Sequence, residues 1–118
     1  MSTSTLFGAS FDAHDAAKLA QFWAAALGRE LADGANADNA VVLPGDVAAT
    51  GPRLAFHRVP EPKTVKNRVH FDLITTDIDT ESARLIGLGA TKLNSLQGQA
   101  HWVTFADPEG NEFDVIAN

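Results

Sequence analysis

The amino-acid sequence predicts an α+β fold built from two tandem βαβββ modules in a single domain. Three observations predict it. Two stretches of the chain match in pattern, and in each a helix with one apolar stripe follows the opening strand. After each helix, apolar and polar residues alternate with a period of two. We place the first module at residues 4–60 and the second at residues 67–118. Two twisted half-sheets of this kind are expected to form a curved sheet or open barrel with the helices outside and a ligand site on the concave face.

The repeat becomes visible when Asp15 is aligned with Asp77, an offset of 77 − 15 = 62 residues. Both opening strands then show period-two alternation, with apolar residues on one face. The apolar positions that coincide are Phe7, Ala9 and Phe11 with Val69, Phe71 and Leu73. On the opposite face, Gly8 coincides with His70 and Ser10 with Asp72.

A helix is expected after each opening strand. Asp15 is placed as the N-cap of the first helix, and Asp77 or Asp79 as that of the second. Both helices are expected to end at a Leu-Gly pair, where glycine supplies a left-handed C-terminal turn. The apolar stripes contain Leu19, Phe22, Trp23, Ala26 and Leu27 in the first helix, and Ile78, Leu85, Ile86 and Leu88 in the second. Trp23 is assigned to the core.

Six further strands are expected, three in each module. In the first module they are "RELA" (29–32), "AVVL" (40–43) and "RLAFHRV" (53–59). In the second they are "TKL" (91–93), "HWVTFA" (101–106) and "EFDVI" (112–116). The terminal strand puts Glu112 and Asp114 on one face and Phe113 and Val115 on the other.

Composition excludes several classes of function. The 118 residues contain no cysteine, which excludes disulfides, thiolate metal sites and a cysteine nucleophile. The net charge of −6 argues against nucleic-acid binding, which depends on neutralising phosphates. The start of the chain lacks a signal-peptide pattern and no apolar run is long enough to span a membrane, so we expect a cytoplasmic protein with no membrane partner.

The paired modules, "HDAAKLAQFWAAALGRE", "KNRVHFDL" and "DPEGNEFDVI" resemble the vicinal oxygen chelate superfamily, and more narrowly its small glyoxalase-like domains. The resemblance covers nearly the whole chain. It implies a small-molecule pocket on the concave sheet face. It also implies either a metal-assisted lyase, isomerase or dioxygenase, or a metal-free protein that binds or sequesters a small molecule, as bleomycin-resistance proteins do. A homodimer is implied as well.

The resemblance also implies a ligand set. Metal-dependent members use one inward-facing position on the first and on the last strand of each module. The matching positions in the second module are His70 and Asp114, seven residues after Asp107. In the first module they are Gly8, which cannot ligate, and His57, if Phe56 is aligned with Phe113. The expected cofactor is therefore one divalent ion (Fe, Mn, Ni, Co or Zn) on His57, His70 and Asp114, with no organic cofactor.

Other residues receive expected roles around this site. Glu112, on the same face as Asp114, is the candidate general base. His101 and Trp102 at the cavity rim, and the basic Lys66 and Arg68 beside Lys63, are candidates for binding the substrate. His14 is expected at the surface. In the metal-free alternative, His70 hydrogen-bonds Asp114 or Asp72 across the sheet and the pair is structural. A purely regulatory module with an occluded cavity is the third alternative.

Overall fold

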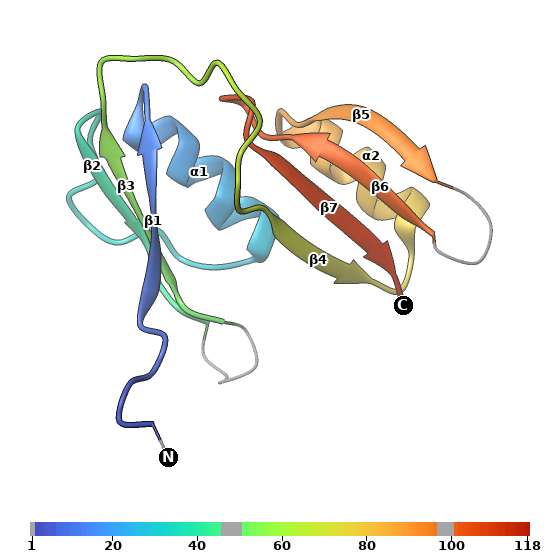
Figure 1. Cartoon of the computed structure of the whole chain (residues 1–118), viewed down its shortest axis with the longest axis horizontal. Coiled ribbons are helices and arrows are strands. Elements are labelled where there is room, and N and C mark those ends of the chain that lie inside the picture. The colour runs from blue at the N-terminus through green and yellow to red at the C-terminus, as the bar shows by residue number, and fades with distance from the viewer. Residues whose placement is uncertain (1, 46–50, 97–100) are drawn as a thin grey trace. The chain divides into compact units, whose positions relative to one another are not determined.

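The computed structural model describes residues 2–45, 51–96 and 101–118 of the chain. The chain divides into two compact units, Met1–Pro62 and Lys63–Asn118. Within the described residues, each unit consists of one helix packed on one β-sheet (Figure 1). The predicted α+β architecture is therefore confirmed.

The first unit holds a three-stranded sheet. It contains β1 (Gly8–Ala13), α1 (Ala16–Leu27), β2 (Asn39–Val42) and β3 (Arg53–Arg58), and the strand order is β1-β3-β2. β1 runs parallel to β3, whereas β2 runs antiparallel to it. The predicted strand at 29–32 is reduced to an isolated bridge between Leu31 and Val42.

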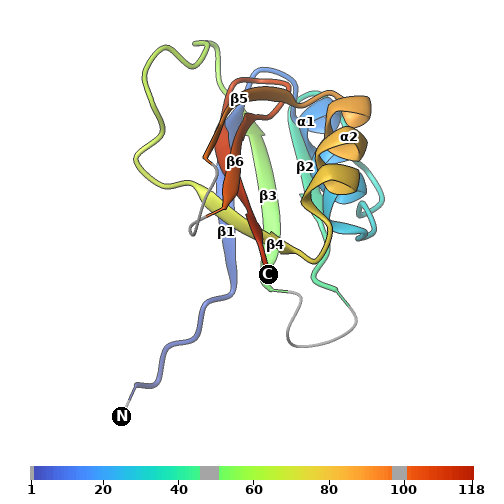
Figure 2. The ribbon, with the colours of Figure 1, turned by 90° about the vertical axis from the view of Figure 1, so that its right-hand side faces the viewer.

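The second unit holds a four-stranded sheet. It contains β4 (Phe71–Thr75), α2 (Ile78–Leu88), β5 (Thr91–Leu96), β6 (Trp102–Ala106) and β7 (Glu112–Ala117), in the order β4-β7-β6-β5. β4 is parallel to β7, and the other two pairs are antiparallel. α2 lies along one face of this sheet (Figure 2).

Both helices begin at a predicted cap and end at the predicted Leu-Gly pair, but only Gly28 takes the predicted left-handed helical conformation, since Gly89 has φ 121° and ψ 4°. The carboxylate of Asp15 accepts a hydrogen bond from the Lys18 amide, and that of Asp77 accepts one from the Thr80 amide. Of the two predicted caps for α2, Asp77 is thus the one used. Gly28 ends α1 with φ 64°, a left-handed conformation that side chains disfavour.

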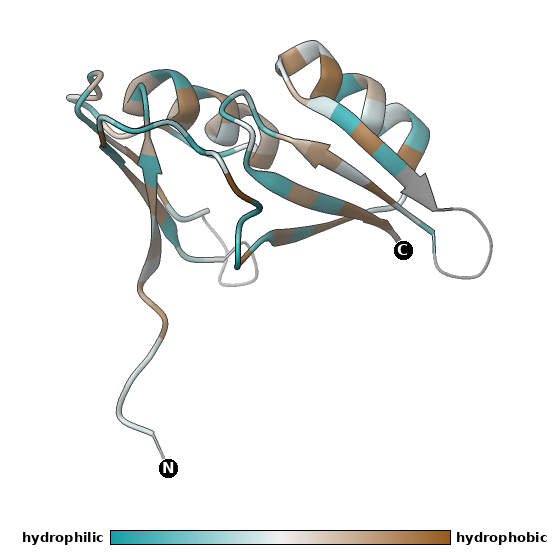
Figure 3. Cartoon of the chain, turned by 45° about the horizontal axis from the view of Figure 1, so that its top comes forward, coloured by the Kyte–Doolittle hydropathy of each residue, from teal (hydrophilic) through white to brown (hydrophobic). Residues whose placement is uncertain are grey.

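Each unit has its own hydrophobic core. In the first, Phe11 lies between Trp23 of α1 and Phe56 of β3, with ring centroids 6.1 and 4.9 Å away. In the second, Phe105 and Phe113 stack at 5.6 Å beneath α2. Figure 3 shows hydrophilic and hydrophobic residues alternating along β4 and β7, so each strand turns one face to the core and one away from it.

Some predicted core positions are wrong. Ile86 and Leu88 were assigned to the buried stripe of α2 but are 48% and 37% exposed. The sheet covers a single side of this helix, and Leu85 already occupies that side. Phe7 and Val69 are exposed because each precedes the strand that was expected to contain it.

None of the helices in the described part of the chain is long and apolar enough to cross a bilayer.

Candidate metal centre

The turn before β7 sets the position of every site residue on that strand. Asp107 is buried, and its Oδ1 accepts hydrogen bonds from the backbone amides of Glu109 (2.9 Å) and Asn111 (3.0 Å). Gly110 has φ 88°, which a residue with a side chain rarely adopts. The predicted turn role of Asp107 is confirmed, and β7 starts at Glu112 as a result.

Alternation along β7 then separates core from site. Phe113 and Val115 are fully buried beneath α2, whereas Glu112 and Asp114 point to the opposite face. The parallel pairing of β4 with β7 sets Asp72 directly beside Asp114, and the antiparallel pairing of β6 with β7 sets Thr104 on its other side. These three polar side chains therefore form one row across the sheet.

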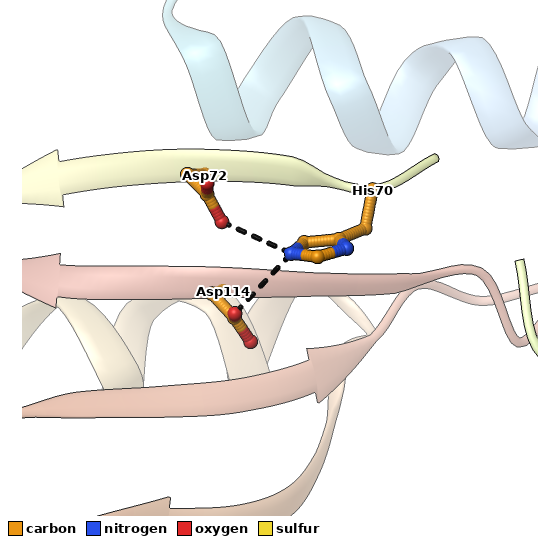
Figure 4. Close-up of side chains that lie close together, drawn as sticks. All are labelled: His70, Asp72 and Asp114. Carbon is orange, nitrogen blue, oxygen red and sulfur yellow. Dashed lines mark ion pairs between the residues drawn. The ribbon is translucent and has the colours of Figure 1, made fainter. Parts of the chain in front are cut away.

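His70 completes a cluster on this face. Its Nε2 atom lies 3.3 Å from Asp72 Oδ1 and 3.5 Å from Asp114 Oδ2 (Figure 4). One donor atom from each of the three residues lies within 4.8 Å of the other two. The side chains of His70, Asp72 and Asp114 are 41%, 55% and 22% exposed, so the cluster is open to a ligand.

Thr104 fixes the orientation of Asp114. Its hydroxyl donates a hydrogen bond of 2.6 Å to Asp114 Oδ1. The other carboxylate oxygen, Oδ2, is thereby turned toward His70. A partner of this kind holds a ligating carboxylate in one rotamer, and its loss typically weakens metal binding by about 10- to 100-fold.

The donor atoms are spaced as the ligands of one ion are spaced. Imidazole nitrogen and carboxylate oxygen bind divalent ions at about 2.1 Å, so neighbouring donors stand about 3.0 Å apart in an octahedral site and about 3.4 Å apart in a tetrahedral one. The separations of 3.3 and 3.5 Å from His70 Nε2 to the two carboxylates match these values, and the donor atoms of Asp72 and Asp114 lie within 4.8 Å of each other. The residues present therefore fit a divalent metal ion.

The register of the first sheet corrects the predicted alignment of the modules. The 62-residue offset is sound, because Asp15 and Asp77 both cap a helix. Asp72 pairs with Asp114, and its counterpart Ser10 pairs with Ala55. The first-module counterpart of Asp114 is thus Ala55, and aligning Phe56 with Phe113 was wrong by two residues. That alignment matched phenylalanine to phenylalanine and did not consider the strand pairing. The pairing determines which residues of the two modules occupy equivalent positions in space.

His57 consequently lies two residues beyond the position that the family pattern uses. It is exposed on β3, and its Nδ1 is 3.0 Å from Asn39 Oδ1. The two residues share a surface pocket with Asp38, Arg58, Val59 and Pro60. His57 belongs to the first unit, whereas the cluster lies wholly in the second. Its role as a metal ligand stays a prediction.

Glu112 is held by the segment that leads into β4. Its Oε2 accepts a hydrogen bond of 3.0 Å from the Lys63 ammonium, and its Oε1 accepts one of 3.0 Å from the Asn67 amide. Burial raises the pKa of Glu112, but its hydrogen bonds from Asn67, Lys63 and its own backbone amide, together with the charge of Lys63, lower the pKa below its usual value. The carboxylate is ionised, and both of its oxygens are engaged.

The four predicted substrate-binding residues lie around the sheet of the second unit. Trp102 opens β6 and lies on the same face as Asp114, because it is two residues from Thr104. His101 precedes it, partly exposed, with its carbonyl accepting from the Ala117 amide. Lys66 and Arg68 are exposed in the segment before β4. His14 is exposed, as predicted.

Asp72 is the site residue that the sequence-based ligand set lacks. The sequence does carry a signal for it, because Asp72 follows His70 by two residues and so shares its face of an opening strand. Its proximity to Asp114 depends on the parallel pairing of β4 with β7, which joins residues 42 positions apart, 114 − 72. The repeat by itself does not reveal that pairing.

A profile of the glyoxalase-like domain family matches residues 8–116 of the chain. No curated protein sequence matches it significantly. Solved structures with the same fold include a mutant of the fosfomycin resistance protein FosX from Listeria monocytogenes, complexed with Mn(II) and 1S,2S-dihydroxypropylphosphonic acid. It is 15% identical, with a TM-score of 0.76 over 99% of this chain and 92% of that one.

Two further structures share the fold. FosX from Mesorhizobium loti is 13% identical, with a TM-score of 0.73 over 100% of this chain and 94% of that one. A glyoxalase-related enzyme from Fulvimarina pelagi is 15% identical, with a TM-score of 0.70 over 97% and 88%. With the family profile spanning both units, the chain belongs to the glyoxalase-like domain family of the vicinal oxygen chelate superfamily.

Proposed function

We propose that this protein is a metal-dependent glyoxalase-like enzyme that acts on a small organic molecule presenting two neighbouring oxygen atoms. The observation that carries the proposal is the convergence of three potential ligands on one point. His70 Nε2 lies 3.3 and 3.5 Å from carboxylate oxygens of Asp72 and Asp114, distances that two ligands of one divalent ion also have, and all three donor atoms lie within 4.8 Å of one another. The Mn(II) complex of the Listeria FosX, a protein of the same fold, supports it.

In this proposal His70, Asp72 and Asp114 hold the ion, and Thr104 orients Asp114 through its hydrogen bond. One imidazole and two carboxylates make a harder donor set than the two histidines and one carboxylate expected from sequence. Carboxylate oxygens suit Mn(II), so this donor set reduces the affinity advantage that Zn(II) has over Mn(II) at nitrogen-rich sites. A bound ion supplies Lewis-acid stabilisation of negative charge on a substrate oxygen. A lyase, an isomerase and a dioxygenase all use this chemistry, and the reaction type stays a prediction.

Glu112 as the general base stays a prediction as well. A base must reach the substrate's acidic proton and accept it. Glu112 is ionised, as a base must be, but Lys63 and Asn67 occupy its oxygens. The base role therefore requires release from Lys63, and a Lys63→Met variant is expected to raise the rate of any proton abstraction that Glu112 performs.

The experiment is calorimetric titration of the chelator-treated protein with Mn(II), Fe(II), Ni(II) and Zn(II), preceded by metal analysis of the protein as purified. We expect one equivalent of Mn(II) to bind with micromolar affinity or better. His70→Ala should abolish this binding, and Asp72→Asn should weaken it at least tenfold. Binding that survives at full stoichiometry in His70→Ala would overturn the proposal.

A matched pair of histidine variants separates the two ligand sets. His14→Ala removes an exposed histidine that belongs to neither set and should leave the affinity unchanged. His57→Ala should also leave it unchanged if the second unit alone holds the metal. A tenfold or greater loss in His57→Ala would instead support the ligand role predicted from sequence for His57.

A metal-free binding protein is the second candidate function. The observation that favours it is that His70 Nε2 already lies 3.3 and 3.5 Å from two carboxylates, so the three side chains can hold one another in place without an ion. The two candidates differ in their response to a chelator. Ligand binding is lost on chelation in the first and retained in the second.

The small-molecule partner, the assembly and the location complete the proposal. His101, Trp102, Lys66 and Arg68 are proposed to contact the substrate around the metal. A homodimer is proposed from the family resemblance, and sedimentation velocity tests it. A cytoplasmic location is proposed because a chain without cysteine suits a reducing compartment.

A further inference from the structure

The site face of the second sheet carries a second row of side chains beside the donor row. Ile74 pairs with Ile116 across β4 and β7, and Ile116 pairs with Trp102 across β7 and β6. Each of the three lies two residues along its strand from the row formed by Asp72, Asp114 and Thr104. Ile74 follows Asp72 and Ile116 follows Asp114, whereas Trp102 precedes Thr104 because β6 runs antiparallel. They therefore share the face of the cluster. We call Ile74, Ile116 and Trp102 the apolar strip.

The strip is uncovered. Ile74 is 68% exposed, Ile116 is 36% exposed and Trp102 is partly exposed. Exposed apolar side chains scattered singly are ordinary, whereas these three lie in register on adjacent strands and form one continuous apolar surface beside the donor cluster. On the other side of the donor cluster, Glu112 lies next to Ala106 on β6 and forms an ion pair with Lys63 from the segment before β4. The donor cluster thus lies between an apolar and a charged border.

The dimensions of the strip favour a small ligand. Three adjacent strands span about 10 Å, and two residues along a strand span about 7 Å. A system of one or two fused rings fits this width when the ring carbon that bears the metal-binding oxygens lies above Asp72 and Asp114. A stable protein interface needs roughly 800 Å² from each partner, far more than three side chains provide.

We propose that the apolar strip binds the planar, apolar body of the substrate, so that the substrate is an aromatic or similarly flat compound whose two neighbouring oxygens are attached directly to the ring or one bond from it. This inference rests on the proposed metal-dependent function, because the metal fixes where the oxygens lie. Trp102 presents its indole face to the ring, and Ile116 and Ile74 extend the contact toward the sheet edge.

The test compares two chelating probes with the same metal-binding head. Acetohydroxamate and benzohydroxamate each offer two neighbouring oxygens, and the second adds a phenyl ring. Both are titrated calorimetrically into the full-length protein loaded with Mn(II). Because the ring removes apolar surface from water on the strip, benzohydroxamate should bind about tenfold more tightly than acetohydroxamate, or better.

Two matched isoleucine variants locate the effect. Ile74→Thr removes an exposed isoleucine from the strip, whereas Ile86→Thr removes one from α2, on the layer that covers the other face of the sheet. The preference for benzohydroxamate should fall to less than threefold in Ile74→Thr and in Trp102→Leu, and persist in Ile86→Thr. Mn(II) affinity should be unchanged in all three, with folding checked by circular dichroism.

The outcomes separate this inference from the proposed function. Mn(II) binding with equal affinity for both probes overturns the apolar-strip proposal and leaves the metal proposal standing. No Mn(II) binding overturns both. A preference for the ring that survives in Ile74→Thr and Trp102→Leu places the ring elsewhere and overturns the inference. If Ile74→Thr or Trp102→Leu dissociates an oligomer and still prefers benzohydroxamate, the inference is also overturned. The apolar strip would then be an interface between copies of the chain.

Discussion

Gly8 is the first-module counterpart of His70, and its surroundings explain why no side chain stands there. A Cβ atom at this position would lie 2.8 Å from Arg53 Cγ and 2.9 Å from the Arg53 carbonyl oxygen. Arg53 is the strand partner of Gly8, and its guanidinium carbon lies 4.8 Å from the centre of the Phe7 ring. The space that a ligating side chain would need is thus occupied.

This packing changes the effect expected for substitutions at Gly8. From the sequence, Gly8→His is expected to raise metal affinity by filling a vacant ligand position. From the structure, we expect it to destabilise the protein, and Gly8→Ala to cost on the order of 1 kcal/mol in unfolding free energy, because backbone atoms must shift. Gly87→Ala is the control, since a Cβ there meets nothing within 4 Å in α2. It should stabilise by roughly 0.5–1 kcal/mol. Urea unfolding of both variants tests the contrast, and equal effects would contradict it.

The hydroxyl of Thr104 should matter for metal binding more than for folding. Thr104→Val keeps the shape of the side chain and removes the hydrogen bond to Asp114. We expect Mn(II) affinity to fall about 10-fold. Thr91→Val, at an exposed position of the same sheet, should have no effect on affinity. Calorimetry on the two variants measures this, and an equal affinity for both would show that Thr104 does not orient the ligand.

The cap of α2 links the stability of that helix to pH. Hydrogen bonds from the Thr80 amide and hydroxyl lower the pKa of Asp77 below its usual value. The ionised cap therefore stabilises the folded state above the unfolded-state pKa of about 3.9, and this stabilisation is lost as the pH falls through the lower folded-state pKa. Asp77→Asn should show a shallower loss of melting temperature than the parent protein between about pH 4 and pH 2. Asp33→Asn, in an exposed loop, should keep the parental slope.

The segment before β4 is joined to β7 by the Lys63–Glu112 ion pair and by Asn67. Both charged side chains are about four-fifths covered, so the pair is screened less than a surface ion pair. Glu112→Gln and Lys63→Met should each lower the unfolding free energy by on the order of 1 kcal/mol. The double variant should lose clearly less than the sum, because one interaction is removed twice. Additive losses in thermal unfolding would show that the two residues act independently.

Metal binding should stabilise the part of the chain that holds the site. A ligand that binds only the folded state adds about 2.7 kcal/mol at one hundred times its Kd. We therefore expect Mn(II) at that excess to raise the melting temperature by several degrees in scanning calorimetry. If the two units unfold in separate transitions, only one transition should move, since all three donors lie within residues 63–118. Both transitions moving equally would indicate that the first unit also takes part, as a His57 ligand would require.

Local features of the sequence were enough to predict much of this architecture. The two helices, the Asp15 cap, the glycine after each helix and the alternation of β7 depend on neighbouring residues and on periods of 3.6 and 2, so the sequence alone predicts them. For the second helix the sequence offered Asp77 or Asp79 as the cap, and the structure decided for Asp77. The same alternation correctly placed Asp114 opposite the core. His70 and Asp114 were paired through the family resemblance, which stands in for knowledge of strand order.

What the tertiary structure decided is the pairing of strands and hence the membership of the site. The parallel register of β4 and β7 brings Asp72 to the cluster, and that of β1 and β3 moves the counterpart of Asp114 from His57 to Ala55. Packing of Arg53 against Gly8 removes the remaining first-module position. The physical reason is that residue spacing along one strand determines which face a side chain takes, whereas its neighbour across the sheet depends on backbone hydrogen bonds between segments far apart in the chain.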